Sequence, residues 1–254
     1  MRDLTAIAVL WQREMIRFFR AKSRVVGTLG MPIFFLAFLG FGFQTSSVPG
    51  IPAGIDYVTY LVPGILGMTI LFSSTFAGIS VLWDREFGFL KEIMVAPVSR
   101  TAIVLGRIAG GATTSLIQGV LILLLAVPMG FPFPGVLPFL AAVAFMLLIA
   151  AAFISLGLIF ASNMKDIHGF SLIMNFVVFP IFFLSGALFP IENLPAWLLP
   201  LAYADPLTYG VDGLRGVLTG VSSFSPLFDA AALFAFVLVL LALGAWFFER
   251  TESA

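Results

Sequence analysis

The sequence predicts an all-α polytopic membrane protein with six transmembrane helices. Of its 254 residues 61% are hydrophobic, only 10% are Asp, Glu, Lys or Arg, and the mean hydropathy is +1.11. Soluble domains are about 45–50% apolar, so this composition excludes an ordinary soluble domain. Apolar runs of about 18–20 residues recur along the chain, and each is long enough to cross the hydrocarbon core as a helix.

Charged segments and segments rich in Pro and Gly separate the apolar runs and define the expected spans. The six spans are predicted at residues 25–43, 57–82, 101–127, 136–161, 170–190 and 229–248. No repeat with a period of about 20–50 residues is evident. We therefore expect residues 1–254 to form one transmembrane domain, with a six-span bundle at 25–248 and a short cytoplasmic tail at 249–254.

Residues 1–24 predict an amphipathic helix that lies in the membrane interface. Charges occur throughout this segment, unlike the apolar core of a cleaved signal peptide. On a helical wheel one face carries apolar side chains and the opposite face carries arginines. The apolar face holds Leu4, Ile7, Ala8, Trp11, Met15 and Phe18, and the basic face holds Arg13, Arg17, Arg20 and Arg24. Trp11, Arg13, Arg17 and Arg20 are the candidate interface residues.

Basic residues are distributed unevenly between the two sides of the predicted bundle. Twelve of the 13 Lys and Arg residues lie in segments 1–24, 83–100, 162–169 and 249–254 or at Arg107, and only Arg215 lies on the other side. Short loops that carry an excess of Lys and Arg face the cytoplasm. Both termini and the segment from residue 83 to 100 are therefore predicted to be cytoplasmic.

The external segment 191–228 is too apolar for a solvated loop, and prolines interrupt it too often for a span. A pair of short re-entrant or interfacial helices fits this composition. The alternative is a structured loop in which Asp212 pairs locally with Arg215, because residues three apart share a helix face.

Catalytic motifs are missing from the sequence. His168 is the only histidine, and neither GxSxG nor HExxH occurs, so we predict no catalytic residue and no metal site. The phosphate-binding motif GxxxxGK[ST] is also absent, so this chain is not expected to hydrolyse ATP. The chain carries no net charge, and we expect it to bind membrane lipids and no nucleic acid.

Ion-coupled transport requires an ionisable side chain within a span, because such groups are costly in the membrane. The other five predicted spans hold no such residue in their middles, and Arg107 lies about six positions into the third span, near its cytoplasmic end. We expect its long side chain to reach the head groups, with a substrate or ion role as the alternative. Proton-coupled antiport therefore has little support.

Two stretches resemble type-2 ABC exporter permeases, the membrane subunits related to daunorubicin-resistance and polysaccharide-export systems. They are "DREFGFLKEIMVAPVSRTAIVLGRIAGG" (84–111) and "FLSGALFPIENLPAWLLPLAYADPLTYGVDGLRG" (183–216). With the N-terminal helix and the six spans, the resemblance covers essentially the whole chain. It implies a permease homodimer in the inner membrane of a prokaryote, although a different permease could be the partner. It also implies two copies of a separate ATPase subunit, which would hold ATP and Mg, and no cofactor in this chain.

The resemblance further implies a coupling helix between spans two and three that docks on the ATPase. Charged side chains and an apolar plug at these positions suit a protein groove, whereas the alternative is a solvated surface helix. The matching residues are Asp84, Arg85, Glu86, Phe87, Gly88, Phe89, Leu90, Lys91 and Glu92, and Lys165 and Asp166 form a second, shorter contact.

The substrate pathway is predicted less closely. Spans two and five contribute Ser73, Ser74, Phe76, Met174 and Asn175 as candidate pathway residues. Packing between helices is the alternative use of such side chains. We expect an exporter for an amphipathic or lipid-like molecule, such as a drug, a lipid or a lipid-linked glycan. The alternatives are an undecaprenyl-linked polysaccharide exporter and a non-transporting assembly or sensory partner of an ATPase.

Small residues at Gly106 and Gly110 form a GxxxG pattern in the third span. This spacing permits close helix approach, and we expect it to serve packing within the chain.

Overall fold

The computed structural model describes residues 2–43, 49–52, 54–86, 98–164 and 166–251, and the regular elements in these ranges are all helical. The longer helices are α1 (Arg2–Arg20), α2 (Lys22–Gly42), α3 (Tyr57–Ala77), α4 (Ile79–Glu86), α6 (Arg100–Ala126), α7 (Val136–Asn163), α8 (Ile167–Leu184), α10 (Pro206–Thr219) and α11 (Pro226–Thr251). The short ones are α9 (Leu199–Tyr203) and two 3-10 turns at Val127–Met129 and Ile191–Asn193.

The structure is that of a polytopic α-helical membrane protein. Within the described ranges five helical segments are long and apolar enough to cross a membrane: Tyr57–Asp84, Thr101–Met129, Val136–Asn163, Ile167–Leu184 and Pro226–Gly244. The apolar part of α2, Val26–Gly42, is shorter than the length that a span usually needs. The predicted all-α class is thus supported, whereas the sixth span over α2 stays a prediction.

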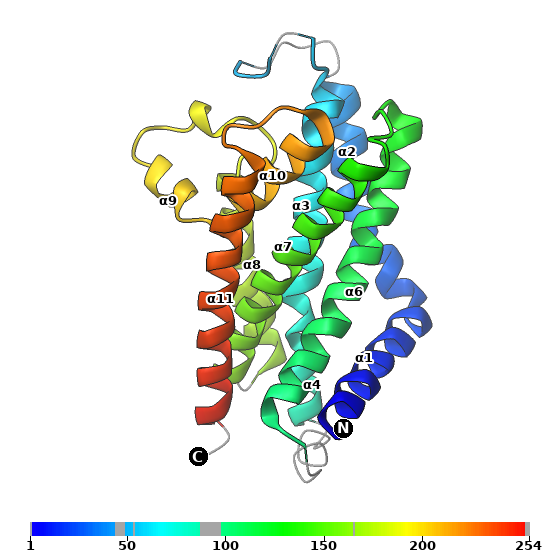
Figure 1. The fold of residues 1–254 in the computed structure, drawn as a ribbon, viewed down its shortest axis with the longest axis vertical. Helices are drawn as coiled ribbons and strands as arrows, with labels where there is room; N and C mark the ends of the chain where they lie inside the picture. The colour runs from blue at the N-terminus through cyan, green and yellow to red at the C-terminus, as the bar shows by residue number, and fades with distance from the viewer. Residues whose placement is uncertain (1, 44–48, 53, 87–97, 165, 252–254) are drawn as a thin grey trace.

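The long helices stand side by side, with α3 at the centre of the bundle (Figure 1). The beginning of α1, α4 and the end of α11 lie at one end, called here the terminal end, and α9 and α10 lie toward the opposite end. Most of α3 is buried, and Leu61, Val62, Ile65 and Leu66 have no exposed surface. The hydrophobic core therefore surrounds α3, which packs against α2, α6, α7 and α10.

The predicted span at 57–82 is divided at Gly78, where α3 ends and α4 begins. A Cβ atom at Gly78 would lie 2.7 Å from the backbone of Gly157 in α7, and one at Gly157 would lie 2.5 Å from the carbonyl oxygen of Thr75. Only glycines allow the two backbones to approach so closely. This contact holds the junction between α3 and α4 against α7.

Helix starts are capped by side chains of the expected types. Asp56 accepts a hydrogen bond from the backbone N–H of Thr59 at α3, and Ser99 accepts one from Ala102 at α6. Asp166 accepts hydrogen bonds from Gly169 and His168 at α8, and these bonds lower the pKa of its carboxyl. Polar residues in the connecting segments thus set where the helices begin.

Between α8 and α11 the chain forms α9 and α10, and a pair of short helices was expected in this segment. The alternative expectation, a local ion pair between Asp212 and Arg215, is wrong. The Asp212 carboxylate accepts the backbone N–H groups of Ser223 (2.9 Å) and Phe224 (2.8 Å). The Arg215 guanidinium donates to the carbonyl of Gly186 at 2.9 Å. Backbone groups thus take both side chains, because backbone N–H and C=O groups need hydrogen-bond partners where water is removed.

Helix α1 is amphipathic as predicted, but it packs on α6 and turns Arg13 and Arg17 inward, whereas Arg20 is exposed. A Cβ atom at Gly106 would lie 2.9 Å from the Cβ of Leu10, so the GxxxG glycines of α6 serve contact with α1, within the chain as expected. The Trp11 indole N–H donates to the Thr113 hydroxyl at 3.0 Å. From the predicted basic face, Arg13 and Arg17 approach the buried carboxylate of Asp84 at the terminal end, and placement of this helix in the membrane interface stays a prediction.

Candidate functional site

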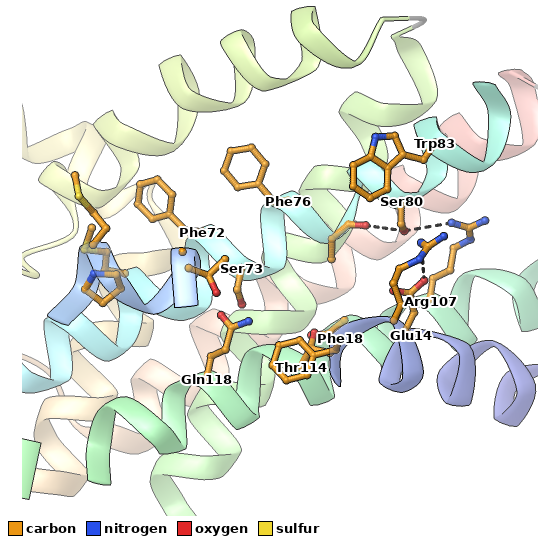
Figure 2. Close-up of a pocket in the computed structure, with 18 of the residues that line it drawn as sticks. Glu14, Phe18, Phe72, Ser73, Phe76, Ser80, Trp83, Arg107, Thr114 and Gln118 are labelled. Atoms are coloured by element: carbon orange, nitrogen blue, oxygen red, sulfur yellow. Dashed lines mark hydrogen bonds and ion pairs between the residues drawn. The ribbon is translucent and has the colours of Figure 1, made fainter. Parts of the chain in front are cut away.

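A cavity of about 590 Å³ lies between α1, α2, α3, α4, α6 and α8 (Figure 2). Helix α6 lines it with Arg107, Gly111, Thr114 and Gln118, which are spaced by four, three and four residues and so share one helix face. The size falls within the range of about 300–1,000 Å³ that is usual for small-molecule sites.

Most of the cavity wall is apolar. Phe72 and Phe76 from α3, Phe179 from α8 and Met31 from α2 contribute to it. The rings of Phe72 and Phe179 meet edge to face at a centroid distance of 5.3 Å. This wall suits a hydrophobic molecule.

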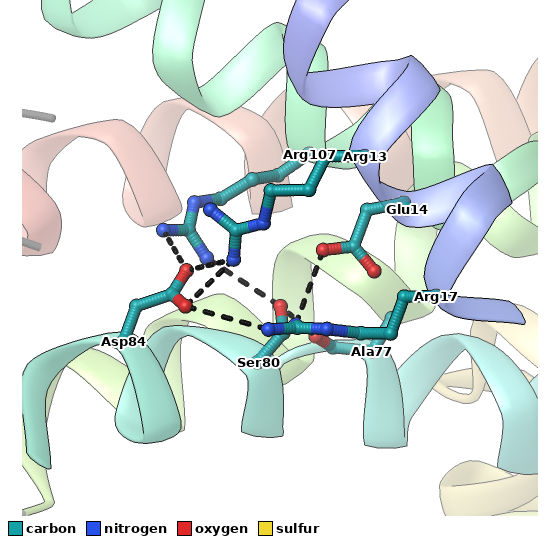
Figure 3. Close-up of polar contacts among 7 residues, drawn as sticks. All are labelled: Arg13, Glu14, Arg17, Ala77, Ser80, Asp84 and Arg107. Atoms are coloured by element: carbon teal, nitrogen blue, oxygen red, sulfur yellow. Dashed lines mark hydrogen bonds and ion pairs between the residues drawn. The ribbon is translucent and has the colours of Figure 1, made fainter. Parts of the chain in front are cut away.

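The polar end of the cavity adjoins a cluster of charged side chains around Asp84 (Figure 3). The Asp84 carboxylate is 3% exposed and accepts hydrogen bonds from Arg13 at 2.6 Å and from Arg107 at 2.8 Å. The Arg17 guanidinium lies 3.7 Å from the same carboxylate. A buried carboxylate is costly unless it is paired and hydrogen-bonded, and these arginines from α1 and α6 provide the partners.

The expectation that Arg107 reaches the head groups is wrong. Its side chain is only 5% exposed, and its guanidinium donates to Asp84 and at 3.4 Å to the Ser80 hydroxyl. The carboxylate of Asp84 offers a partner inside the bundle, so the guanidinium remains there.

Two residues that line the cavity each carry a buried polar atom without a hydrogen-bond partner among the described residues. They are Arg107, at its Nε, and Gln118, at its Oε1, and the side chain of Gln118 is 4% exposed. Buried polar groups are almost always hydrogen-bonded, so an N–H donor and a carbonyl acceptor without partners are unusual. The arrangement therefore places an unused donor in the wall at the charged end of the cavity and an unused acceptor further along α6.

The predicted coupling residues are only partly described. Asp84 belongs to the buried cluster, so its carboxylate is engaged within the chain. Arg85 and Glu86 end α4, and their side chains are not described. Phe87 to Glu92 and Lys165 lie outside the described residues, whereas Asp166 caps α8 on the exposed surface. Docking of this segment on an ATPase stays a prediction.

The predicted pathway residues are divided between the cavity and other positions. Ser73 and Phe76 line the cavity. Ser74 donates to the Ser115 hydroxyl at 2.9 Å, Met174 is fully buried, and Asn175 is exposed on α8.

Sequence reasoning missed Arg17, Gln118 and Phe179 as cavity residues. A signal was present in α6, where small and polar residues recur at helical spacing from Arg107 to Gln118 in an otherwise apolar span.

Comparison with known proteins identifies the family. Residues 5–219 match the model of a family described as ABC-2 type transporter. The inner membrane transport permease YadH of Escherichia coli K12 is 27% identical over 221 residues, which cover 85% of this chain and 84% of that protein.

Two further relatives show similar coverage. Nodulation protein J of Sinorhizobium fredii is 29% identical, over 81% of this chain and 78% of that protein. A putative transport permease, ycf38 of Porphyra purpurea, is 28% identical, over 82% and 72%. Because the family model covers most of its length, the chain belongs to the ABC-2 type transporter family and is a membrane permease subunit.

Proposed function

We propose that this permease exports an amphipathic or lipid-like molecule from the cytoplasm or the inner leaflet, driven by a separate ATPase subunit. The observation that supports this most directly is the cavity, which combines an aromatic wall with a polar end in a chain that lacks a P-loop. A drug, a lipid or a lipid-linked glycan would meet these two requirements of the site.

Energy would enter through residues 84–95. Permeases of the ABC-2 type work with ATPase subunits, and two copies here would bind ATP and Mg. Asp84 is the first residue of this segment and lies near the end of α4. Its carboxylate contacts Arg13 of α1 and Arg107 of α6. A displacement of the segment would therefore be transmitted to both helices through the carboxylate.

Both termini are proposed to be cytoplasmic and the protein to lie in the inner membrane. The beginning of α1 and the end of α11 share the terminal end (Figure 1), in agreement with an even number of spans. The uneven distribution of basic residues supports the cytoplasmic side, and one relative is named as an inner membrane permease.

A homodimer is proposed as the working assembly. Helices α2 and α8 present large apolar side chains on their outer faces, including Phe38 (66% exposed) and Phe176 (82% exposed). These faces would pair around the pathway. Cross-linking of the assembled complex distinguishes this arrangement from a pair of different permeases.

Reconstitution with the ATPase tests the proposal. Inverted vesicles that contain both subunits should take up a labelled amphiphile when ATP is supplied, and uptake should persist when the proton gradient is dissipated. A non-transporting partner of the ATPase would show assembly without uptake, and a secondary transporter would lose uptake with the gradient.

The coupling segment has a separate test. Glu86→Ala combined with Lys91→Ala should lower the ATP turnover that the permease stimulates, because both charges would contact the ATPase. Glu192 lies toward the end of the bundle opposite the terminal end. Glu192→Ala is therefore the matched control and should leave turnover unchanged. Unchanged assembly and turnover in the double variant would exclude the coupling assignment.

A further inference from the structure

We propose that the cavity binds an anionic amphiphile, with an acidic phosphate head group between Arg17 and Arg107 and an apolar chain along the aromatic wall (Figure 2). This inference rests on the proposed function, because it names the class of cargo that the permease would accept. Its evidence is independent of the family, since it comes from the donors, the charges and the shape of the cavity.

Arg17 retains donors for a further acceptor, and the buried Arg107 adds a positive charge at the same end of the cavity. Arg107 directs its two terminal nitrogens to Asp84 and Ser80, and its Nε has no hydrogen-bond partner among the described residues. The closest carboxylate contacts of Arg17 are 3.4 Å to Glu14 and 3.7 Å to Asp84. Charge-assisted hydrogen bonds are about 2.7–2.9 Å long, so Arg17 is held loosely and can turn toward a bound anion.

The charge around this end favours an acid over a base. Among the described side chains of the cluster, the guanidiniums of Arg13, Arg17 and Arg107 face the carboxylates of Asp84 and Glu14. An ammonium head group would meet this positive excess in a partly buried site, where repulsion is stronger than in bulk water. A phosphate would add the missing negative charge and accept several N–H donors at once.

The remainder of the cavity suits an alkyl chain. Arg107 and Gln118 are eleven positions apart in α6, which corresponds to about 16 Å along the helix axis. Phe72, Phe76 and Phe179 line this length, and the exposed Gly27 and Met31 of α2 belong to the rim. A chain from the surrounding membrane could enter on the side of α2.

Binding of dodecyl phosphate is the direct test, with the full chain in nanodiscs of phosphatidylcholine. Trp83 lines the cavity, so its fluorescence should change and saturate during the titration, and Trp83→Phe should abolish that signal. Dodecanol and dodecyltrimethylammonium should bind at least about tenfold more weakly, because the hydroxyl of dodecanol carries no negative charge and the trimethylammonium group accepts no hydrogen bond.

Two arginines of α1 provide a matched pair of variants. Arg17→Gln should weaken dodecyl phosphate binding about tenfold and leave dodecanol binding unchanged, since it removes one charged donor. Arg20→Gln removes the same charge from the exposed end of the helix, outside the cavity, and should have no effect. Equal affinities of these two variants would overturn the proposal.

Arg107 needs a paired change, because its loss alone leaves Asp84 without one of its buried partners and destabilises the fold. Arg107→Gln with Asp84→Asn removes both charges together and should also weaken dodecyl phosphate about tenfold. Retained affinity in a folded double variant would contradict a role for Arg107.

The source of the phosphate is resolved by changing the nanodisc. If phosphatidic acid replaces part of the phosphatidylcholine and competes with dodecyl phosphate, a membrane lipid enters the cavity. If phosphatidic acid does not compete, saturable binding of dodecyl phosphate assigns the site to a water-borne amphiphile. Absence of dodecyl phosphate binding in both kinds of nanodisc overturns the inference. The test involves no ATPase, so its failure leaves the proposed export function intact, and failure of ATP-driven uptake leaves the binding result intact.

Discussion

Asp84 shows how a single residue organises the terminal end of the bundle. Its carboxylate is buried and joins Arg13, which is 71 residues away in the chain, to Arg107, which is 23 residues away. Breaking a buried ion pair by removing one partner costs more than the pair contributes, because a charge is left behind without compensation.

Asp84→Asn should lower the free energy of unfolding by about 3 kcal/mol, since it leaves the Arg107 guanidinium buried and unpaired. Thermal unfolding in detergent measures the effect. Glu192→Gln is the control, because this exposed carboxylate accepts one hydrogen bond from Ser223, and its loss should cost about 0.5 kcal/mol or less. Addition of Arg107→Gln to Asp84→Asn should recover part of the lost stability. If Asp84→Asn alone lost no more stability than Glu192→Gln, the stabilising role of the cluster would be refuted.

Two capping aspartates should give pH dependences of opposite sign. Burial raises the pKa of Asp205 well above its ordinary value of 3.8, so its contribution to stability declines as the pH rises through the folded pKa. Asp205→Asn keeps the cap and should flatten this decline. The hydrogen bond from the backbone N–H of Gly169 lowers the pKa of Asp166, so the stabilisation by its carboxylate is lost as the pH falls through the folded pKa. Asp166→Asn should therefore destabilise the fold only above that pKa.

Thermal unfolding of both variants between acidic and neutral pH checks these signs. If the unfolding temperatures of the two variants, relative to the unmodified chain, changed with pH in the same direction, the result would contradict the burial of the Asp205 carboxyl and the exposed hydrogen bonding of the Asp166 carboxyl.

At the scale of the elements, the seam between α1 and α6 depends on two glycines. A Cβ at Gly106 would lie 3.2 Å from the backbone of Ile7, and one at Gly110 would lie 2.8 Å from the Cβ of Glu14. The close approach brings Arg13 and Arg17 to Asp84, so the seam positions the charged end of the cavity.

Gly106→Val should separate α1 from α6 and cost about 1–3 kcal/mol, because the added atoms overpack the seam. The chain has no cysteine, so Trp11→Cys with Thr113→Cys, whose native side chains are hydrogen-bonded, reports the seam by disulfide formation. Gly106→Val should slow this cross-link, and Gly30→Val, with open space around it, should not. Equal rates would show that the seam tolerates the larger side chain.

Helix positions could be predicted closely because apolar length and capping are local properties. The span expected at 101–127 corresponds to α6, and that at 136–161 corresponds to α7. The span expected at 170–190 ends early, at Leu184, because Gly186 adopts a positive φ of 73° that stops the helix. That glycine stands within a stretch of high overall hydropathy, so hydropathy alone did not show the break.

At the scale of the whole molecule, α1, α4 and α6 meet at one carboxylate and surround one cavity (Figure 3). If ATP-driven movement of residues 84–95 is transmitted through this end, α1 and α6 must shift relative to each other. Fixing their distance would then stop transport while binding continues.

The disulfide between Trp11→Cys and Thr113→Cys should therefore reduce ATP-dependent uptake of the amphiphile at least about tenfold, and a reductant should restore it. Dodecyl phosphate binding should change little, because neither position lines the cavity. The two single variants under the same oxidant are the controls. Full transport by the cross-linked protein would exclude relative motion of α1 and α6 as a step in coupling.

The sequence by itself determined the helical class, the approximate helix ends and the family motifs, because these depend on neighbouring residues. Only the tertiary structure decided that Arg107 turns inward, that Arg13 and Arg17 face Asp84, and that Gln118 lines a cavity with Phe72 and Phe179. The physical reason is that a helical wheel shows which residues share a face but not what that face contacts. The partner that stabilises a buried charge lies on another helix, and packing of the bundle selects it.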